Sequence, residues 1–277
     1  MSTYVRDIDQ HFWSNNQVSH LTIRRTISSV QGYKAHSHDE LSIGLIESGT
    51  TCSTIGGREV LIHKNEGVII APNVVHACNP VSNLPRSYQM LYIDNKWCCD
   101  VLSRLYDLSV TQFECEIDVL KDTGITKKLS SLCLSLIENV TQETISEINH
   151  HLYSIISRYC APSLQDSDRD KIAYQVKARL LDDFINPPSI LDISKELSRP
   201  TESLIRSFKR QFGTTPKSFL NSHRIEKAKL LLKSGMNIVD VACEVGFSDQ
   251  SQFHKAFVNY TASTPRQYQA TSVNFRQ

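Results

Sequence analysis

The feature that most constrains the fold of this chain is an internal repeat in its last third. Residues of one segment recur 48 positions later: Ile190, Asp192, Ile193, Glu196 and Leu197 match Ile238, Asp240, Val241, Glu244 and Val245. After one inserted residue the match continues at a spacing of 49: Leu204, Phe208, Pro216, Lys217 and Phe219 match Phe253, Phe257, Pro265, Arg266 and Tyr268. The repeat predicts two copies of one small structural unit.

Apolar spacing predicts a short helix, a turn and a longer helix in each copy. In the second copy, the first stripe follows the i, i+3, i+4, i+7 pattern: Ile238, Val241, Ala242 and Val245. Gly246 ends that helix, and Ser248 is the expected N-cap of the next. In the first copy, Gly213 ends the longer helix. Two helices joined by a short turn are typical of a helix-turn-helix unit, whose second helix can enter the major groove of DNA.

The outward positions of the second helices carry short polar and cationic side chains. They are Glu202, Ser203, Arg206, Lys209 and Arg210 in the first copy, and Gln250, Ser251, Gln252, His254 and Lys255 in the second. Such side chains reach base edges and phosphates. Residues 171–277 hold 16 Lys and Arg against 9 Asp and Glu, whereas residues 1–170 hold 14 against 20. The net charge of +1 therefore combines +7 and −6, and the basic part favours a polyanionic partner over packing alone.

These segments resemble the AraC/XylS family of bacterial transcription regulators over roughly the last hundred residues. The residues that carry the resemblance lie in 224–232 (RIEKAKLLL), 238–242 (IVDVA), 246–253 (GFSDQSQF) and 264–268 (TPRQY), with Phe257. The resemblance implies two helix-turn-helix units joined by a rigid helix over residues 222–234, which enter successive major grooves about 34 Å apart. Matching the family's base-contacting positions gives Glu202, Ser203, Ile205 and Arg206, then Gln250, Ser251, His254 and Lys255.

Three residues depart from the family pattern. Pro200 takes the cap position where the family usually has Ser, so Thr201 must cap or the helix must begin differently. Ala262 stands where the second copy normally has Gly, which leaves the following turn in question. Ile205 is apolar at a position that the resemblance implies could face DNA, where it could touch a thymine methyl or be packed.

The N-terminal part predicts a different fold. Short β-branched or alternating runs over 21–23, 41–46, 51–55, 60–62 and 68–70 are separated by turn residues, which indicates a small barrel or sandwich. His36 and His38, if on a strand, point the same way, so they could converge with His76 inside the barrel. The pattern resembles the cupin-type sensor barrel common at the N-terminus of this family. Metal-binding cupins have a Glu some four residues after the second His, whereas here Glu40 lies two positions short.

The three histidines leave two alternatives open: a metal site, or hydrogen-bonded residues that contact an effector. We predict the second, with His36, His38, His76 and Glu40 as effector contacts and with neither a metal nor a cofactor. The eight cysteines have no metal spacing, and we expect reduced thiols.

Helical stripes follow residue 95, and those within 125–159 exceed what a small barrel can cover. One of these helices is therefore a candidate dimer seam, as the resemblance also suggests. The expected domains are an effector and dimerisation domain over 1–160, a linker over 161–169, and a DNA-binding domain over 170–277 whose first helix spans about 170–185.

The chain is predicted to be α+β, with an N-terminal cupin-like β-barrel, a helical dimerisation segment and an all-α C-terminal domain. No signal peptide or membrane helix is apparent, so a cytoplasmic protein is expected. The predicted function is a homodimeric regulator, an activator rather than an enzyme, that binds promoter DNA under the control of a small molecule and could contact RNA polymerase. The alternative is a cupin metalloenzyme using His36, His38 and His76 with a helical appendage.

Overall fold

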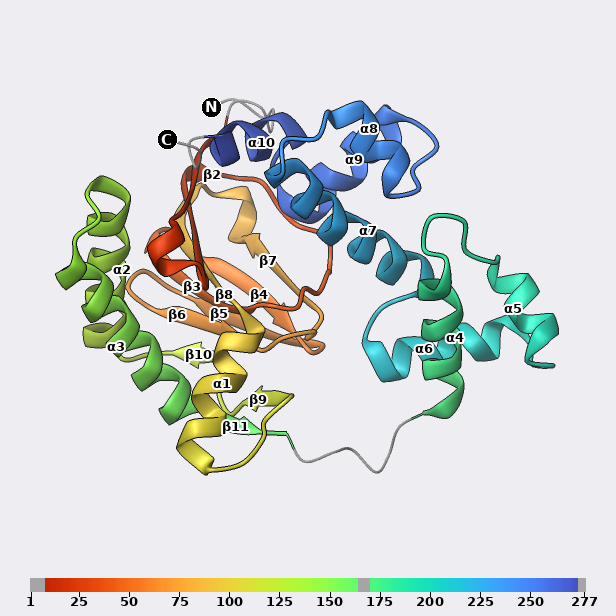
Figure 1. Cartoon of the computed structure of the whole chain (residues 1–277), viewed down its shortest axis with the longest axis horizontal. Helices are drawn as coiled ribbons and strands as arrows, with labels where there is room; N and C mark the ends of the chain where they lie inside the picture. Colours follow the sequence, from red (N-terminus) through yellow and green to blue (C-terminus); the bar gives the residue numbers. More distant parts are fainter. Residues whose placement is uncertain (1–7, 164–169, 274–277) are drawn as a thin grey trace. The chain divides into compact units, whose positions relative to one another are not determined.

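The computed structural model describes residues 8–163 and 170–273 (Figure 1). The chain divides into two compact units. Of the described residues, the first holds 8–31, 39–73 and 78–163, and the second holds 170–273 together with two short segments, 32–38 and 74–77. A sheet-rich N-terminal part and a helical C-terminal part confirm the predicted α+β class.

The strands of the N-terminal part form three sheets among the described residues. The six-stranded sheet has the order β1-β2-β8-β3-β6-β10, the three-stranded sheet is β5-β4-β7, and β11 pairs with β9. Their bounds are β1 Asp9–Ser14, β2 Leu21–Ser29, β3 Leu41–Ser48, β4 Thr51–Ile55, β5 Arg58–Ile62, β6 Gly67–Ile70, β7 His76–Pro80, β8 Arg86–Ile93, β9 Phe113–Cys115, β10 Val119–Leu120 and β11 Cys160–Pro162.

The five strands expected from the sequence are confirmed as β2 to β6. The clearest local cause is at β4 and β5, where Ile55 pairs with Arg58 across Gly56 and Gly57. Both glycines have positive φ, 54° and 85°, which suits the tight two-residue turn of a hairpin. In contrast, His36 and His38 are not in a strand: they lie in the connection between β2 and β3, and only His36 forms an isolated bridge, to His76.

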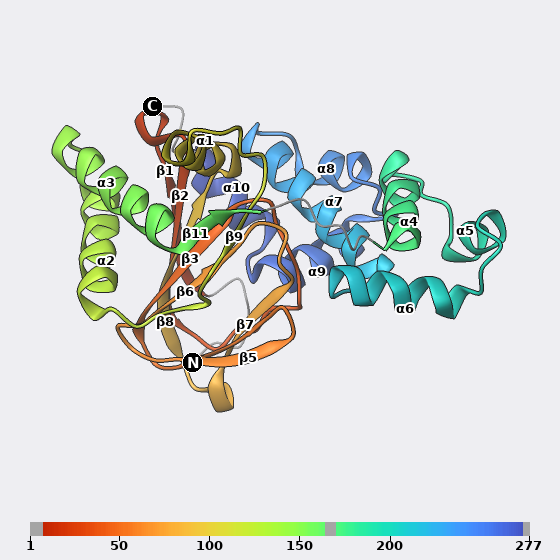
Figure 2. The ribbon, with the colours of Figure 1, turned by 90° about the horizontal axis from the view of Figure 1, so that it is seen from below.

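Three α-helices lie in the described part of the first unit: α1 Asn95–Tyr106, α2 Thr123–Glu138 and α3 Gln142–Tyr159. Figures 1 and 2 show α2 and α3 side by side. Their stripes, including Leu129, Leu136, Ile148 and Leu152, join one buried core with strand residues such as Ile43. One chain therefore buries these residues itself, and the dimer seam expected within residues 125–159 stays a prediction.

The second unit contains seven helices over the residues described between 170 and 273. They are α4 Lys171–Asp182, α5 Ile190–Glu196, α6 Thr201–Phe212, α7 Pro216–Lys233, α8 Ile238–Glu244, α9 Gln250–Thr261 and α10 Pro265–Val273. The predicted linker overlaps β11 at residues 161–162, and its residues 164–169 lie outside the described residues. For the described residues, none of the helices is long and apolar enough to cross a membrane.

The connecting helix α7 begins six residues earlier than the sequence analysis predicted. Thr215 caps it by accepting a hydrogen bond from the backbone N–H of Ser218, and Pro216 occupies the first turn. Proline is well suited to that position because its fixed φ is helical and its missing N–H has no partner to lose there. The helix contacts α4 and α6 as well as α8, α9 and α10, so it joins both copies of the repeat.

Candidate nucleic-acid interface and ligand site

The two copies of the repeat fold alike. In both, the first helix has 7 residues (α5 and α8) and the second has 12 (α6 and α9). The turn covers residues 197–200 in the first copy and 245–249 in the second, so the inserted residue lies in the turn. The predicted pair of helix-turn-helix units is therefore confirmed in its architecture.

Each second helix is held by its apolar face. In the first copy, Leu204 and Phe208 are fully buried and pack in a cluster with Val176, Leu180 and Ile193. In the second copy, Phe253 and Phe257 are fully buried, and the ring centroids of Phe257 and Tyr268 lie 5.6 Å apart. Because one face of each helix is fixed in this way, the opposite face is turned away from the core.

The ten residues predicted to contact DNA are all exposed. They are Glu202, Ser203, Arg206, Lys209, Arg210, Gln250, Ser251, Gln252, His254 and Lys255. Ile205, which the family positions also placed at the interface, is only partly exposed. The structure thus gives the side chains of α6 and α9 the accessibility that reading a groove requires.

One of these ten is also engaged inside the unit. Nη2 of Arg210 lies 2.6 Å from Oδ2 of Asp170, and the Ser207 hydroxyl donates to the same oxygen at 2.5 Å. Asp170 also caps α4 by accepting from the N–H groups of Ile172 and Ala173. The Ser207 hydrogen bond is the largest cause that lowers the pKa of Asp170, and Arg210 adds to it. Arg210 therefore links α6 to the start of α4 as well as facing outward.

The caps of the two second helices differ from the predicted ones. Asp249, not Ser248, caps α9: its Oδ1 accepts from the N–H of Gln252 at 2.7 Å. Pro200 occupies the cap position of α6, which begins at Thr201 without a side-chain cap. The turn in question after α9 does form, with Ala262 in the left-handed conformation at φ 49°.

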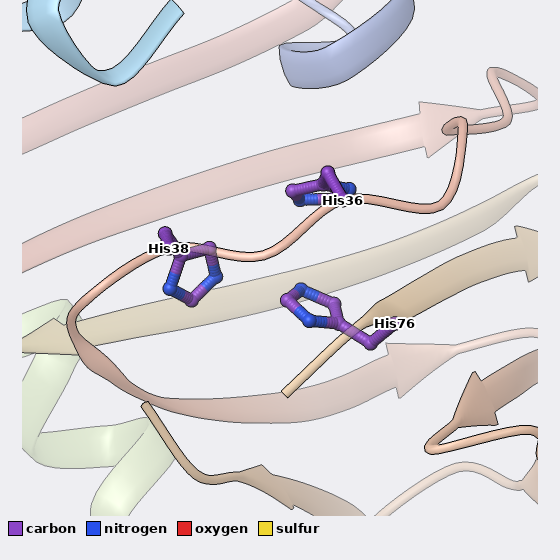
Figure 3. A group of neighbouring side chains, drawn as sticks. All are labelled: His36, His38 and His76. Carbon is purple, nitrogen blue, oxygen red and sulfur yellow. The ribbon is translucent and has the colours of Figure 1, made fainter. Parts of the chain in front are cut away.

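His36, His38 and His76 come together in the structure (Figure 3). The ring centroids lie 4.5 Å apart for His36 and His76, 4.9 Å for His38 and His76, and 5.8 Å for His36 and His38. His38 and His76 are buried, and His36 is half-buried. The group of metal-binding residue types that gathers here in the described chain does not include Glu40, whose role as an effector contact stays a prediction.

Two buried arginines of the first unit were missed by the sequence analysis. Arg24 on β2 and Arg86 on β8 are 2% and 1% exposed, and each guanidinium lies over the ring of Tyr88, at 5.9 and 5.1 Å from its centroid. Arg86 donates to the carbonyl of Cys78 at 2.8 Å. Buried cations favour a nearby anion, so both are candidate contacts for an acidic ligand. The sequence did carry a signal for Arg24. Adjacent residues of a strand point to opposite faces, so one of the neighbouring Arg24 and Arg25 must face the interior of a sheet that is covered on one side.

Comparison with known families identifies both parts. A model of a helix-turn-helix domain matches residues 193–271, and a model of the AraC-like ligand binding domain matches residues 21–182. The uncharacterized HTH-type transcriptional regulator YbfI of Bacillus subtilis is 25% identical over 245 residues, 84% of this chain and 85% of YbfI. The HTH-type transcriptional regulator MtrA of Neisseria gonorrhoeae is 28% identical over 167 residues, 59% of this chain and 51% of MtrA.

Solved structures share the fold of nearly the whole chain. ToxT from Vibrio cholerae with a bound unsaturated fatty acid aligns with a TM-score of 0.57 and 16% identity, covering 96% of this chain and 99% of ToxT. ToxT from strain O395 aligns with a TM-score of 0.53 over 91% of this chain and 96% of that one. Because the ligand-binding model alone spans more than half of its length, the chain belongs to the AraC family of transcription regulators, with a helix-turn-helix DNA-binding domain and a ligand-binding domain.

Proposed function

We propose that this regulator reads promoter DNA with α6 and α9 in two successive major grooves, using the ten exposed residues named above. The observation that carries the proposal is the repeated architecture: two second helices of equal length each bury an aromatic face and expose amides, hydroxyls and cations. Bidentate or paired contacts of such side chains discriminate bases, whereas their cations also bind phosphates.

Selection of binding sites from a random DNA library with the purified full-length protein tests this proposal. We expect enriched sequences with two half-sites separated by about one helical turn, roughly 10 base pairs. Binding should weaken steeply with salt, because each neutralised phosphate releases counterions. No enriched sequence, or affinity that does not change between low and physiological salt, would contradict the proposal.

The effector is proposed to bind in the ligand-binding domain, with His36, His38 and His76 among its contacts. The support is the meeting of three imidazoles from separate segments of the chain. ToxT has been solved with an unsaturated fatty acid and with (E)-4-(8-methylnaphthalen-1-yl)but-3-enoic acid, so a chain of this fold can hold a small molecule. Thermal melts of the full-length protein against panels of acids, sugars and ions test for an effector, and a regulator without one would show no shift in melting temperature.

A homodimer, activation of transcription and contact with RNA polymerase complete the proposal. Light scattering of the purified chain measures its molar mass and so tests for the dimer. Transcription in vitro from the selected promoter shows whether the protein raises or lowers the amount of transcript. The proposal assigns no catalytic step to the chain. The alternative is a cupin metalloenzyme that uses the three histidines. It would require catalytic turnover that is lost when these histidines are replaced, and a wild-type protein that does not bind DNA.

A further inference from the structure

The backbone fixes two of the three clustered histidines opposite each other. The N–H of His36 donates to the carbonyl of His76 at 3.0 Å, and the N–H of His76 donates back to the carbonyl of His36 at 2.9 Å. One ring nitrogen from each of His36, His38 and His76 lies within 4.8 Å of the others (Figure 3). The side chains therefore meet because two separate segments, 32–38 and 74–77, are joined at this pair.

The same hydrogen-bond arrangement orients both rings. Nδ1 of His36 lies 2.8 Å from the carbonyl of Lys34, and Nδ1 of His76 lies 2.8 Å from the carbonyl of Val74, in each case two residues earlier. A carbonyl only accepts, so each Nδ1 carries the hydrogen and each Nε2 keeps its lone pair. Histidines that ligate metals commonly have one ring nitrogen fixed by a carbonyl or carboxylate in this way.

We propose that His36, His38 and His76 form a binding site for a divalent transition-metal ion of the class that prefers imidazole, with Zn²⁺ as the first candidate. Three imidazole nitrogen ligands suit Zn²⁺, Co²⁺ or Ni²⁺ and not the oxygen-seeking Mg²⁺ or Ca²⁺. With metal–nitrogen bonds of about 2.0–2.1 Å, tetrahedral ligand nitrogens lie roughly 3.4 Å apart. Because the ring nitrogens lie within 4.8 Å of one another, metal binding would bring a pair together by at most about 1.4 Å.

Three protein ligands leave a coordination position open. Because Glu40 is not part of the described cluster, that position is available to water or to a small ligand. The histidines belong to the same compact unit as the DNA-binding helices. The further role of the ion as the signal of the regulator rests on the proposed function, whereas the site itself rests on the three histidines.

The direct test is metal binding by the full-length protein after removal of metals with a chelator. We expect one Zn²⁺ per chain by elemental analysis and titration calorimetry, with a dissociation constant near or below about 1 μM. Substituting Co²⁺ should give the visible absorption of a tetrahedral nitrogen site. The variants His38→Gln and His76→Gln should each lose the ion and the Co²⁺ spectrum.

A matched control is available in the adjacent His150 and His151, whose ring centroids are 5.8 Å apart, the same as for His36 and His38. The double variant His150→Gln/His151→Gln should keep one ion per chain. Retention of the ion by His38→Gln and His76→Gln, loss of it in the control, or no binding by the wild-type chain would overturn the proposal. Thermal melting of each variant without metal shows whether it folds. If Zn²⁺ raises the melting temperature of the wild type and not of the histidine variants, the site is supported even where one variant is unstable.

Promoter binding with and without Zn²⁺ separates the two proposals. A promoter affinity that changes with Zn²⁺ in the wild type and not in His38→Gln supports the ion as the signal. If the library yields no enriched sequence with or without Zn²⁺ while the chain still binds one ion, the proposed function fails and the metal site stands.

Discussion

The two helix-turn-helix copies need left-handed backbone at the same two positions, yet each supplies glycine at only one of them. In the turn, Ser198 has φ 50° and its counterpart Gly246 has φ 79°. After the second helix, Gly213 has φ 67° and its counterpart Ala262 has φ 49°. A non-glycine residue in this region costs roughly 1–2 kcal/mol. Both copies therefore adopt the left-handed conformation at both positions. The first copy has glycine only after its second helix, and the second copy has glycine only in its turn.

Packing explains why one of these glycines cannot be exchanged. A Cβ on Gly246 would lie 2.6 Å from the carbonyl oxygen of Ile185 and 2.9 Å from Nη2 of Arg224. Arg224 donates to the same carbonyl at 2.9 Å, so the backbone there is held in place. Ser198 and Ala262 show that a non-glycine residue can adopt a positive φ in this fold. At Gly246 the positive φ is combined with close backbone contact, and that combination requires glycine.

The largest expected effect is that of Gly246→Ala. Adding the conformational cost to the clash with Ile185, we expect the free energy of unfolding to fall by about 2–4 kcal/mol. Gly213→Ala should cost less, about 1–2 kcal/mol, because the conformational term is its main cost. Calorimetric melting of the full-length variants measures both, and equal losses would break the distinction between the two positions.

The second prediction concerns the matched cations Arg206 and Lys255. Arg206→Ala should weaken specific DNA binding by roughly 1–3 kcal/mol and relax the base preference in one half-site, because a planar guanidinium can grip a guanine with two hydrogen bonds. Lys255→Ala should weaken binding less and more evenly across sequences, since lysine is a point charge. Competition binding against base-substituted sites measures both. An equal loss for all sequences in Arg206→Ala would make Arg206 a phosphate contact.

The third prediction uses the unequal caps of α6 and α9. Asp249→Ala removes the acceptor for the N–H of Gln252 and should lower the free energy of unfolding by about 1 kcal/mol. Pro200→Ser supplies a capping hydroxyl at the matching position and should raise it by up to about 1 kcal/mol. Ser248→Ala is the control and should be nearly neutral. If Ser248→Ala cost as much as Asp249→Ala, the assignment of the cap would be wrong.

The smallest expected effect is that of Ala262→Gly. Relief of the left-handed strain is offset by the greater freedom of glycine in the unfolded chain, so we expect a gain of less than about 1 kcal/mol. Because Ala262 is 1% exposed, part of this gain is lost with its methyl contacts. Thermal melting detects the change, and a clear destabilisation would show that packing outweighs strain at this position.

Local patterns predicted the elements of this fold well. The repeat, the strand runs and the glycine stops depend on residues close together in the chain, and β2 to β6 and α4 to α9 appear where these patterns lie. The early start of α7 was also readable, because Thr215-Pro216 is a strong start signal. The sequence did not show that Asp249 rather than Ser248 caps α9, because both residue types can cap a helix and only the path of the backbone decides between them.

Long-range packing was harder to predict. The apolar stripes of α2 and α3 were expected to exceed what a small barrel can cover, because the six-stranded sheet and α1 that help to bury them are not visible in local spacing. The histidines were expected on a strand but meet in an irregular connection, and Glu40 falls outside their group. The burial of Arg24 could be read from its place beside Arg25 in a strand, whereas the burial of Arg86 depends on the pairing of β2 with β8, which local spacing does not reveal.

The uninterrupted course of α7 has a consequence for the operator. One residue added within this helix would rotate everything after it by about 100° and move it by about 1.5 Å. The reading surface of α9 would then face away from the groove, whereas an insertion in an exposed loop would leave both surfaces aligned. The length of α7 thus fixes the spacing between the two DNA half-sites. Binding sites of this regulator should therefore tolerate a changed base more readily than a base pair added or removed between the half-sites.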